Sequence, residues 1–383
     1  MLITIIGGTG AIGSYFAYNL AAAGNQVSIV GKEHSKNLQQ ISESGLTLKT
    51  DNGIYFTPNL NFTYIGAYNY SSLVTKQDLL IVSLKQTDFN LEIAKQIVNL
   101  TDEHSMIGFI SNGIPFYFLK YTSLANKTHL QTIDPEGEIN QILSSRNIIT
   151  IIPLMGSHLE SPAVVKITTP LSKIKVDVGS QFTNEESLEL INQIFDKANI
   201  NSNYNKNISK AILEKLQFAL SINVMSALLN QTNGYVFEAK ENQNYILYVI
   251  KFVNNLAQNL GIHNLRNYDT FKLANISKLH FSSMHKDMMD CKTPEVKSII
   301  SAPLELAYYF QEQGMMHLST KPLEAAQELI LTKNFDIFPS SKQIESIYAE
   351  SILALKEENI TSIEFNNSGL IKLADQLEMD LIL

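Results

Sequence analysis

The chain begins with an apolar run that breaks into a glycine-rich turn. Residues 2–6 are Leu-Ile-Thr-Ile-Ile, and after the turn a helical pattern runs on until Gly24 ends it. Gly8, Gly10 and Gly13 have the spacing G-x-G-x-x-G between a predicted strand and a predicted helix, which is the context that gives this motif meaning. The first glycine permits a tight turn, the second lets a pyrophosphate approach the backbone, and the third lets helix and strand pack closely. The turn therefore predicts a dinucleotide site formed by Gly8, Thr9, Gly10, Ala11, Ile12 and Gly13 at a helix N-terminus.

The end of the second predicted strand bears on the choice between NAD and NADP. Residues 26–30 alternate in polarity and lead into Gly31-Lys32-Glu33-His34. A protein that prefers NAD usually has an acid here, which holds the ribose 2′-hydroxyl. The first charged residue is instead Lys32, which suits the 2′-phosphate of NADP. Two alternatives stay open, namely Glu33 as the ribose ligand and Lys32 as an ordinary surface lysine.

Composition limits the class of protein. With 383 residues, of which 45% are hydrophobic, the chain is long enough for two globular domains. Its net charge of −8 argues against a nucleic-acid partner. The single cysteine, Cys291, excludes an internal disulfide and fits a reducing compartment. The uncharged stretches 52–75 and 216–237 carry too many polar residues to span a membrane, and no basic region precedes the first apolar run. We therefore expect a cytoplasmic protein without membrane or nucleic-acid partners and without a metal.

Strand-like and helical patterns alternate in the first half of the chain. An Asp51-Asn52-Gly53 hairpin signal lies between two short apolar segments. Strands are predicted over 79–84, 106–110, 148–153, 164–168 and 174–178, and helices over 35–44, 87–100 and 184–198. Such alternation predicts a Rossmann-type, doubly wound parallel sheet. Residues 114–146 show no pattern that assigns them.

From Ile208 the pattern becomes helical and stays so. Helices are predicted over 208–230, 242–260, 294–313 and 322–331, and in the tail over 342–358 and 369–382. The predicted organisation is an NADP-binding Rossmann-type domain over 1–205, an all-helical substrate domain over 206–334 and a helical extension over 335–383. The apolar stripes of the tail need a surface to cover, either this subunit's helical domain or a second subunit. A homodimer through the helical domain is thus left open.

Polar residues on apolar helices are the candidates for chemistry. Helical spacing places Lys215 and Ser226, eleven residues apart, almost in line, with Ala219 and Asn223 on the adjoining strip. Such groups form a site, or else the lysine extends to the surface and the asparagine is satisfied in the core. Thr293 and Pro294 predict the start of a helix and place Glu295 in its first turn, where an acid favours the helix dipole without any function.

These residues together carry a resemblance to the ketopantoate reductase family across about residues 1–330. Separate motifs occur in the family's order along the chain. They are the glycine turn, the strand ending in Lys85, the turn Ser111-Asn112-Gly113, the helix with Glu214-Lys215-Leu216 and Asn223, and a segment with Ser282-Ser283-Met284, Asp287, Thr293 and Glu295.

The resemblance implies NADPH-dependent reduction of a 2-oxo acid to a 2-hydroxy acid, in the family's case 2-dehydropantoate (ketopantoate) to pantoate. It implies that Lys215 donates the proton and that Glu295 favours its protonated form, because a carboxylate stabilises a nearby ammonium. The implied substrate-binding residues are Asn223, Asn233 and Ser283. The implied cofactor contacts, besides the glycine turn and Lys32, are Lys85, Asn112 and Glu295.

Two residues depart from the family pattern. Ala219 stands where the family's helix usually has an asparagine, and His280 stands where an asparagine often precedes the serine pair. A changed polar arrangement changes which substrate pairs well with the site. Two alternatives therefore stay open. One is a related oxidoreductase of the same fold, such as an opine-type or 3-hydroxyacid dehydrogenase, and the other is a non-catalytic NADP-binding module whose tail recruits a partner.

Overall fold

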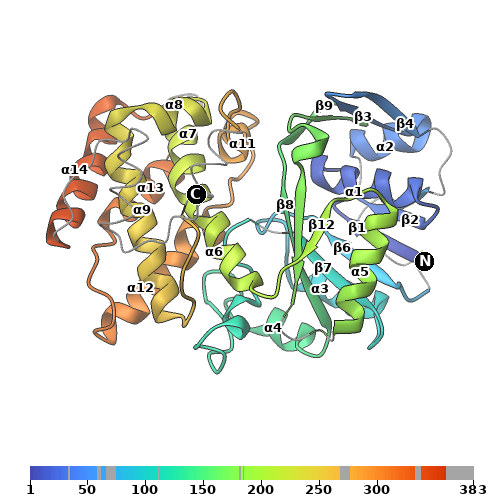
Figure 1. Cartoon of the computed structure of the whole chain (residues 1–383), viewed down its shortest axis with the longest axis horizontal. Coiled ribbons are helices and arrows are strands. Elements are labelled where there is room, and N and C mark those ends of the chain that lie inside the picture. Colours follow the sequence, from blue (N-terminus) through green and yellow to red (C-terminus); the bar gives the residue numbers. More distant parts are fainter. Residues whose placement is uncertain are drawn as a thin grey trace. The chain divides into compact units, whose positions relative to one another are not determined.

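The chain forms two compact units, each of which is described by itself. The computed structural model describes residues 1–32, 35–57, 62–65, 75–110, 112–180, 183, 185–267, 277–332 and 338–358. Unit 1 comprises Met1–Ser111 and Glu138–Ile208, and unit 2 comprises Asn112–Gly137 and Ser209–Leu383. Figure 1 labels the helices and strands of both units.

Unit 1 is built on an eight-stranded sheet with the order β12-β11-β8-β7-β6-β1-β2-β5. The strands are β1 (Leu2–Ile6), β2 (Gln26–Val30), β5 (Phe62–Ile65), β6 (Leu79–Val82), β7 (Met106–Ile110), β8 (Asn147–Leu154), β11 (Lys175–Gly179) and β12 (Ser202–Tyr204). Neighbouring strands are parallel except β8 and β11. The chain fills the sheet on one side of β1 and then crosses to β6 on its other side. The strand order therefore reverses at β1, and its carboxyl end is the place where such sheets bind ligands.

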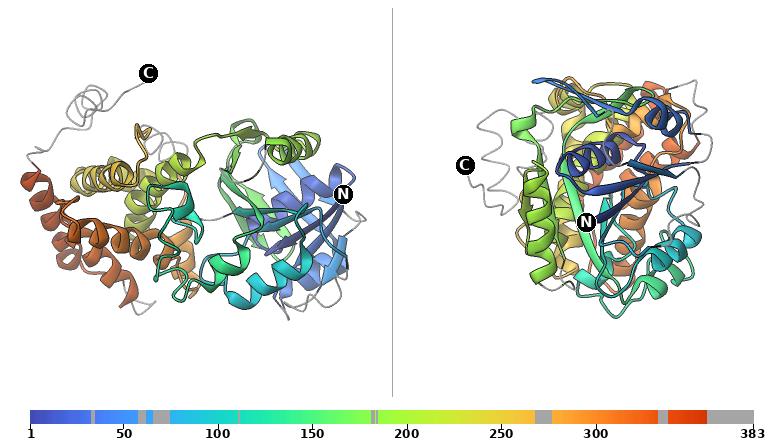
Figure 2. Two further views of the ribbon diagram at one scale, coloured as in Figure 1. Left: turned by 90° about the horizontal axis from the view of Figure 1, so that it is seen from below. Right: turned by 90° about the vertical axis from the view of Figure 1, so that its right-hand side faces the viewer.

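Helices cover both faces of this sheet, so the predicted doubly wound fold is confirmed (Figure 2). They are α1 (Ala11–Ala22), α2 (Lys36–Ser44), α3 (Leu91–Leu100), α4 (Glu138–Leu143) and α5 (Glu185–Lys197). Phe16 on α1 and Phe195 on α5 are both fully buried, and their ring centroids lie 5.5 Å apart. Their contact joins the two helices in one core. The helix predicted over 87–100 begins only at Leu91, because the Asn90 side chain caps it by accepting from the Ile93 N–H at 3.0 Å.

A smaller sheet with the order β4-β3-β10-β9 packs against α1. Its strands are β3 (Leu46–Thr50), β4 (Gly53–Thr57), β9 (Ser157–Ser161) and β10 (Val164–Ile167). The hairpin predicted at Asp51-Asn52-Gly53 is confirmed, since β3 and β4 are antiparallel with Thr50 opposite Gly53. The sequence pattern does not predict β5 or β9.

Unit 2 is helical, as predicted. Its helices are α6 (Ile208–Phe218), α7 (Val224–Leu229), α8 (Asn233–Glu238), α9 (Lys240–Asn259), α11 (Ser283–Met289), α12 (Ala302–Glu312), α13 (Lys321–Leu331) and α14 (Ser341–Glu357). Within the described residues, the stretch Ile208–Leu229 is long and apolar enough to cross a membrane, but 83% of its most apolar window is buried. It is thus typical of a core helix. The tail helix predicted over 342–358 is α14, whereas the one predicted over 369–382 lies outside the described residues.

Residues 112–137 belong to unit 2, although the predicted first domain of 1–205 included them. Glu305 on α12 accepts hydrogen bonds from the backbone N–H groups of Gln131 and Thr132, each at 2.9 Å, and from the Thr132 hydroxyl at 2.6 Å. Such long-range bonds leave no periodicity in the segment itself, and for this reason the sequence did not assign it.

Candidate active site

The glycine turn between β1 and α1 is shaped by close packing at two of its three motif glycines. A Cβ on Gly13 would lie 2.4 Å from the Gly7 carbonyl oxygen, and one on Gly8 would lie 2.8 Å from the Ile29 side chain. A Cβ on Gly10 would meet only the Gly7 carbonyl oxygen, at 3.4 Å. Packing inside unit 1 therefore demands glycine at positions 8 and 13 and leaves room above Gly10, where the motif lets a pyrophosphate approach.

The start of α1 suits an anion. Gly10 is the N-cap residue and offers no side chain to the first turn, which also contains no acid. Unpaired N–H groups and the helix dipole at such an N-terminus favour negative charge. Ser14 donates its hydroxyl to the Gly8 carbonyl oxygen at 2.9 Å and holds the turn in place. Room, backbone donors and the position at the carboxyl end of β1 fit the diphosphate of a dinucleotide.

Lys32 lies beside this turn and forms an ion pair. The Cβ position of Gly31 is 2.7 Å from the Thr9 side chain, so the end of β2 lies against the glycine turn. Lys32 Nζ lies 2.6 Å from Asp88 Oδ1, and 61% of the lysine side chain is exposed. Lys85 follows β6, and its carbonyl oxygen accepts from the Asp88 N–H at 2.9 Å. Glu33, the alternative ribose ligand, lies outside the described residues.

In unit 2, Lys215 and Glu295 interact electrostatically. Burial lowers the pKa of Lys215 from 10.5 to about 8, and the Coulomb attraction of Glu295 opposes this shift. The Glu295 side chain is buried, and its Oε2 accepts from Asn112 Nδ2 at 3.1 Å. Unit 2 thus contains a lysine whose ammonium form is stabilised by a carboxylate and whose pKa of about 8 is lower than that of an ordinary lysine. Asn112, predicted as a cofactor contact, lies against Glu295.

The turn that carries Asn112 depends on Gly113. This glycine has φ +74°, and a Cβ on it would lie 2.3 Å from the Ser298 carbonyl oxygen. The same oxygen accepts the Ile114 N–H at 2.9 Å. Because the backbone passes this close to Ser298, which follows Glu295 in the chain, the turn holds the Asn112 amide within reach of the carboxylate.

One π-helical turn follows Lys215 in the chain, and another follows Glu295. One spans Ala219–Asn223 after Lys215, the other spans Lys297–Ser301 after Glu295, and the two turns contact each other. A π turn inside a helix is rare and occurs frequently at functional sites. The turn at 219–223 also breaks the helical register, so the prediction that Lys215 and Ser226 lie almost in line is wrong.

The prediction for the start of the second helix is wrong as well. Helical structure begins at Val296, and residues 292–295 are not helical. Glu295 therefore lies just before the helix, and Thr293 is not its N-cap residue. Its carbonyl oxygen accepts the Ile299 N–H at 3.1 Å, so Glu295 is at the N-cap position, where an acid still favours the helix dipole. Its interactions with Asn112 and Lys215 are additional to that effect.

The predicted substrate-binding residues lie on segments that are bonded together. The Ser282 hydroxyl donates to the Asn223 carbonyl oxygen at 3.0 Å, and the Ser282 N–H donates to Ser226 Oγ at 3.1 Å. The Asn233 N–H donates to the His280 carbonyl oxygen at 2.8 Å. Ser282 caps α11, and the exposed Ser283 follows it. The side chain of Asn233 is buried, and its Oδ1 has no hydrogen-bond partner in the part of the chain that the structure describes.

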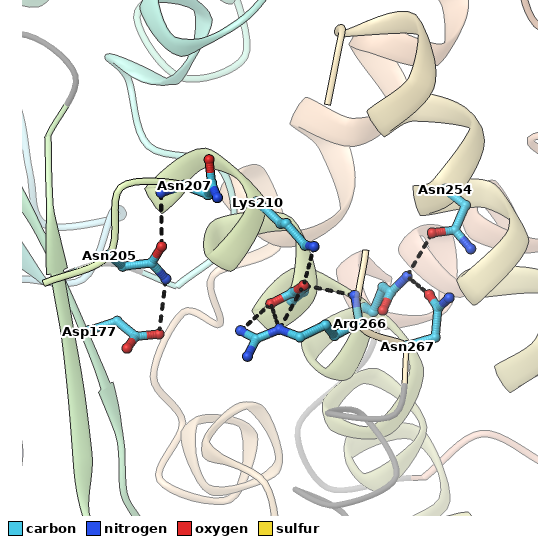
Figure 3. A network of polar contacts seen from close by, with 9 residues as sticks. Asp177, Asn205, Asn207, Lys210, Asn254, Arg266 and Asn267 are labelled. Carbon is cyan, nitrogen blue, oxygen red and sulfur yellow. Dashed lines mark hydrogen bonds and ion pairs between the residues drawn. The ribbon is translucent and has the colours of Figure 1, made fainter. Parts of the chain in front are cut away.

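Glu214, beside the candidate lysine, has a role that the sequence did not reveal. Figure 3 shows Arg266 and Lys210 directed toward its carboxylate. This buried carboxylate accepts from the Arg266 backbone N–H at 2.7 Å and from its Nη2 at 2.8 Å. Gln217, one turn of α6 further on, donates to the Asn254 and Asn267 side chains. The charge-assisted bonds between Arg266 and Glu214, together with these amide bonds, fix the helix that carries Lys215.

Comparisons with known proteins agree along most of the chain. Residues 3–180 match the model of the family "Ketopantoate reductase PanE/ApbA", and residues 207–315 match that of its C-terminal part. The 2-dehydropantoate 2-reductase of Mesorhizobium japonicum is 25% identical over 316 residues, which cover 80% of this chain and 91% of the relative. The enzyme of the same name from Aquifex aeolicus is 23% identical over 309 residues, covering 79% and 89% of the two chains.

Solved structures of this fold include enzymes with different substrates. A PanE/ApbA family ketopantoate reductase from Ralstonia eutropha superposes with a TM-score of 0.66 at 16% identity, covering 90% of this chain and all of the other. D-mandelate dehydrogenase, solved with NADH and anilino(oxo)acetate, superposes with a TM-score of 0.67 at 17% identity, covering 92% and 99%. At such identities the structures support the fold alone.

The close approach of Gly113 to Ser298 predicts that a methyl group at position 113 destabilises the protein. Gly113→Ala should lower the free energy of unfolding by roughly 2–4 kcal/mol, because a strained φ and an overlap with a backbone oxygen add up. Gly24→Ala is the matched control, since Gly24 has φ +84° but no atom within 4 Å of its Cβ position. It should cost only about 1–2 kcal/mol. Urea denaturation of both variants measures the difference, and equal losses would contradict the packing described here.

Proposed function

We propose an NADPH-dependent 2-oxo acid reductase, on the premise that this chain belongs to the ketopantoate reductase family. The proposed reaction reduces 2-dehydropantoate to pantoate. The observation that supports it most directly is the half-buried Lys215, whose pKa of about 8 is set by desolvation against the attraction of Glu295. A general acid works best when its pKa lies near the operating pH.

Lys215 is the proposed proton donor. Reduction of a ketone develops negative charge on the carbonyl oxygen, and an ammonium group beside it stabilises that charge. The proton then moves from Lys215 Nζ to the oxygen, and the neutral amine takes up a proton from solvent before the next turnover. When bound, the reduced nicotinamide supplies the hydride for the carbonyl carbon.

Glu295, oriented by Asn112, keeps Lys215 in its protonated form. The negative carboxylate favours the ammonium form, and the amide of Asn112 fixes one carboxylate oxygen by its hydrogen bond. We assign substrate binding to Asn223, Asn233 and Ser283. The Oδ1 of Asn233, which has no donor among the described residues, supports this assignment, because a buried amide oxygen is costly unless a group such as a ligand donates to it.

The proposed cofactor contacts lie in unit 1 and at two residues of unit 2. The diphosphate would be held by Gly8, Thr9, Gly10, Ala11, Ile12 and Gly13, and the 2′-phosphate by Lys32. We assign further cofactor contacts to Lys85, Asn112 and Glu295. The room above Gly10 and the uncapped start of α1 support the first of these assignments.

A second candidate is a 2-oxo acid with an apolar or aromatic substituent. Ala219 is buried in the π turn one helical turn after Lys215, where a methyl group replaces the family's usual amide. His280 replaces another such amide, and burial lowers the pKa of its imidazole, which favours the neutral ring. The fold is shared with D-mandelate dehydrogenase, whose structure holds an aromatic oxo acid derivative.

The two candidates are separated by rates of NADPH oxidation with 2-dehydropantoate, phenylglyoxylate, 2-oxoisovalerate and pyruvate. The first proposal expects the highest kcat/KM for 2-dehydropantoate, because a site that pairs with a substrate hydroxyl discriminates strongly against molecules lacking it. A higher value for phenylglyoxylate would establish the second candidate. No turnover with any of them, while NADPH still binds, would refute both candidates and leave an opine-type or 3-hydroxyacid dehydrogenase and the non-catalytic module as alternatives.

Lys215→Ala tests the proton donor. We expect kcat to fall by about 10²–10⁴, the usual contribution of a general acid. NADPH affinity should change little, because the glycine turn belongs to unit 1. Lys240→Ala, which removes an exposed lysine at the start of α9 in unit 2, is the control and should keep most of the activity. If the folded Lys215→Ala variant keeps more than about a tenth of kcat, the assignment is wrong and His280 is the next acid to test.

The pH dependence tests the role of Glu295. Reduction needs the protonated lysine, so kcat/KM should fall about tenfold per pH unit above the Lys215 pKa of about 8. Glu295→Gln removes the charge that raises this pKa, and the alkaline limb should therefore move to lower pH. The position of the limb, rather than the absolute rate, is the readout. A limb that stays in place or moves upward would show that Glu295 does not act on Lys215.

Lys32 should decide the cofactor. A charge-assisted phosphate contact contributes roughly 1.5–3 kcal/mol, so Lys32→Ala should weaken NADPH binding about ten- to a hundredfold and leave NADH binding unchanged. Fluorescence titration with both cofactors measures this. Lys49→Ala, which removes another paired surface lysine of unit 1, is the control. If the unmodified protein binds NADH as tightly as NADPH, then Glu33 is the better candidate for the ribose ligand.

A further inference from the structure

The chain continues beyond the part that matches the family's C-terminal model, which ends at residue 315. α14 packs against α9 and α13 in unit 2 (Figure 1). The residues that it buries are Ile344, Ile347, Ser351, Ala354 and Leu355. A capping box of Ser340 and Gln343 begins the helix. Residues 338–358 are thus a packed part of unit 2.

Phe338, just before α14, contacts the segment that carries Ser283. Its ring is nearly parallel to that of His285, with 11° between the planes and 6.3 Å between the centroids. Phe281 stacks on His285 at 4.3 Å. His285 lies in the first turn of α11 and is buried. The tail therefore contributes to the aromatic surroundings of a residue two positions after Ser283.

His285 joins α11 to the end of α7. Its Nε2 lies 2.6 Å from Asn230 Oδ1, so Nε2 is the donor as the amide is oriented. Asn230 ends α7 in the left-handed conformation, with φ 55° and ψ 46°. The chain then turns into α8, where Asn233 is the first residue. One hydrogen bond thus spans the segments that lead to two proposed substrate contacts.

A second connection reaches α8 from the tail. The Tyr348 hydroxyl on α14 donates to Asn242 Oδ1, and Asn242 Nδ2 donates to the Val236 carbonyl oxygen at 2.9 Å. Asn242 is fully buried, and Val236 lies within α8. Removing the tyrosine hydroxyl leaves this buried amide oxygen without its donor.

We propose that residues 338–348 brace the substrate-binding segments at α8 and α11, with His285 as the central positioning residue. This inference rests on the proposed function, since it assigns a task to Ser283 and Asn233. The brace orients the groups that hold the substrate, whereas Lys215 lies on α6 with its own anchor at Glu214. Loosening the brace therefore weakens substrate binding more than it slows the chemical step.

The test uses the full chain with four variants of the brace and one control variant. His285→Leu keeps an apolar side chain but removes the donor, and His285→Gln restores a donor toward Asn230. Phe338→Ala removes the ring contributed by the tail. Tyr348→Phe removes only a hydroxyl, and Tyr248→Phe is its matched control, because Tyr248 is buried and donates to the Ser319 carbonyl oxygen at 2.7 Å, away from α8 and α11.

For the best 2-oxo acid, KM should rise roughly three- to tenfold in His285→Leu, Phe338→Ala and Tyr348→Phe, with kcat changed less than about threefold. His285→Gln should recover most of the lost affinity, and Tyr248→Phe should lower thermal stability without a change in KM. Unchanged KM values in the first three variants, or equal effects in Tyr248→Phe, would overturn the proposal.

Hydrogen exchange separates the brace from the proposed function, because it needs neither substrate nor cofactor. Peptides covering 233–238 and 282–289 should exchange faster in His285→Leu and Phe338→Ala, while peptides of α12 stay unchanged. If they do so and the unmodified protein reduces no 2-oxo acid, the brace stands and the proposed function fails. If exchange is unchanged or rises equally throughout unit 2, the brace is refuted whatever the activity.

Discussion

The interaction between Lys215 and the Glu295 carboxylate depends on how unit 2 packs around these two residues. Burial alone favours the neutral amine, and the carboxylate alone favours the ammonium; together they bring the pKa to about 8. The carboxylate raises the lysine pKa most when it is buried and held close to the ammonium group. Asn112 orients it, and the close passage of Gly113 past Ser298 holds Asn112 in reach. The packing of the 112–137 segment into unit 2 therefore has a direct electrostatic consequence.

The two units contribute different kinds of interaction. Unit 1 offers backbone: a helix N-terminus without a capping side chain and room above Gly10, both of which suit a phosphate group. Unit 2 offers side chains whose charge and direction are fixed by their neighbours, with Glu214 and Arg266 anchoring the helix of Lys215.

Local features of the sequence were predictable, and long-range ones were not. The glycine turn, the hairpin at Asp51-Asn52-Gly53 and the helix over 342–358 each follow from patterns within a few residues. Lys215 and Glu295 were recognised by resemblance, because no local rule tells a catalytic lysine from one at a helix edge. The π turn at 219–223 and the helix start at Val296 have no signal in the local sequence pattern, so helical periodicity misplaced Ser226 and Glu295. The Glu214–Arg266 pair joins residues far apart in the chain, and a lone glutamate beside Lys215 gave no sign of its partner.

The central claim is that Lys215 has a lowered pKa which Glu295 keeps from falling further. The most direct measurement is an NMR titration of the protein labelled with ¹³C at the lysine Cε, with Lys215→Arg identifying the signal. The account predicts that the Lys215 signal titrates with a pKa of about 8, and that the signal in Glu295→Gln titrates at lower pH. A Lys215 signal that titrates near the ordinary value of 10.5 in both proteins would contradict it.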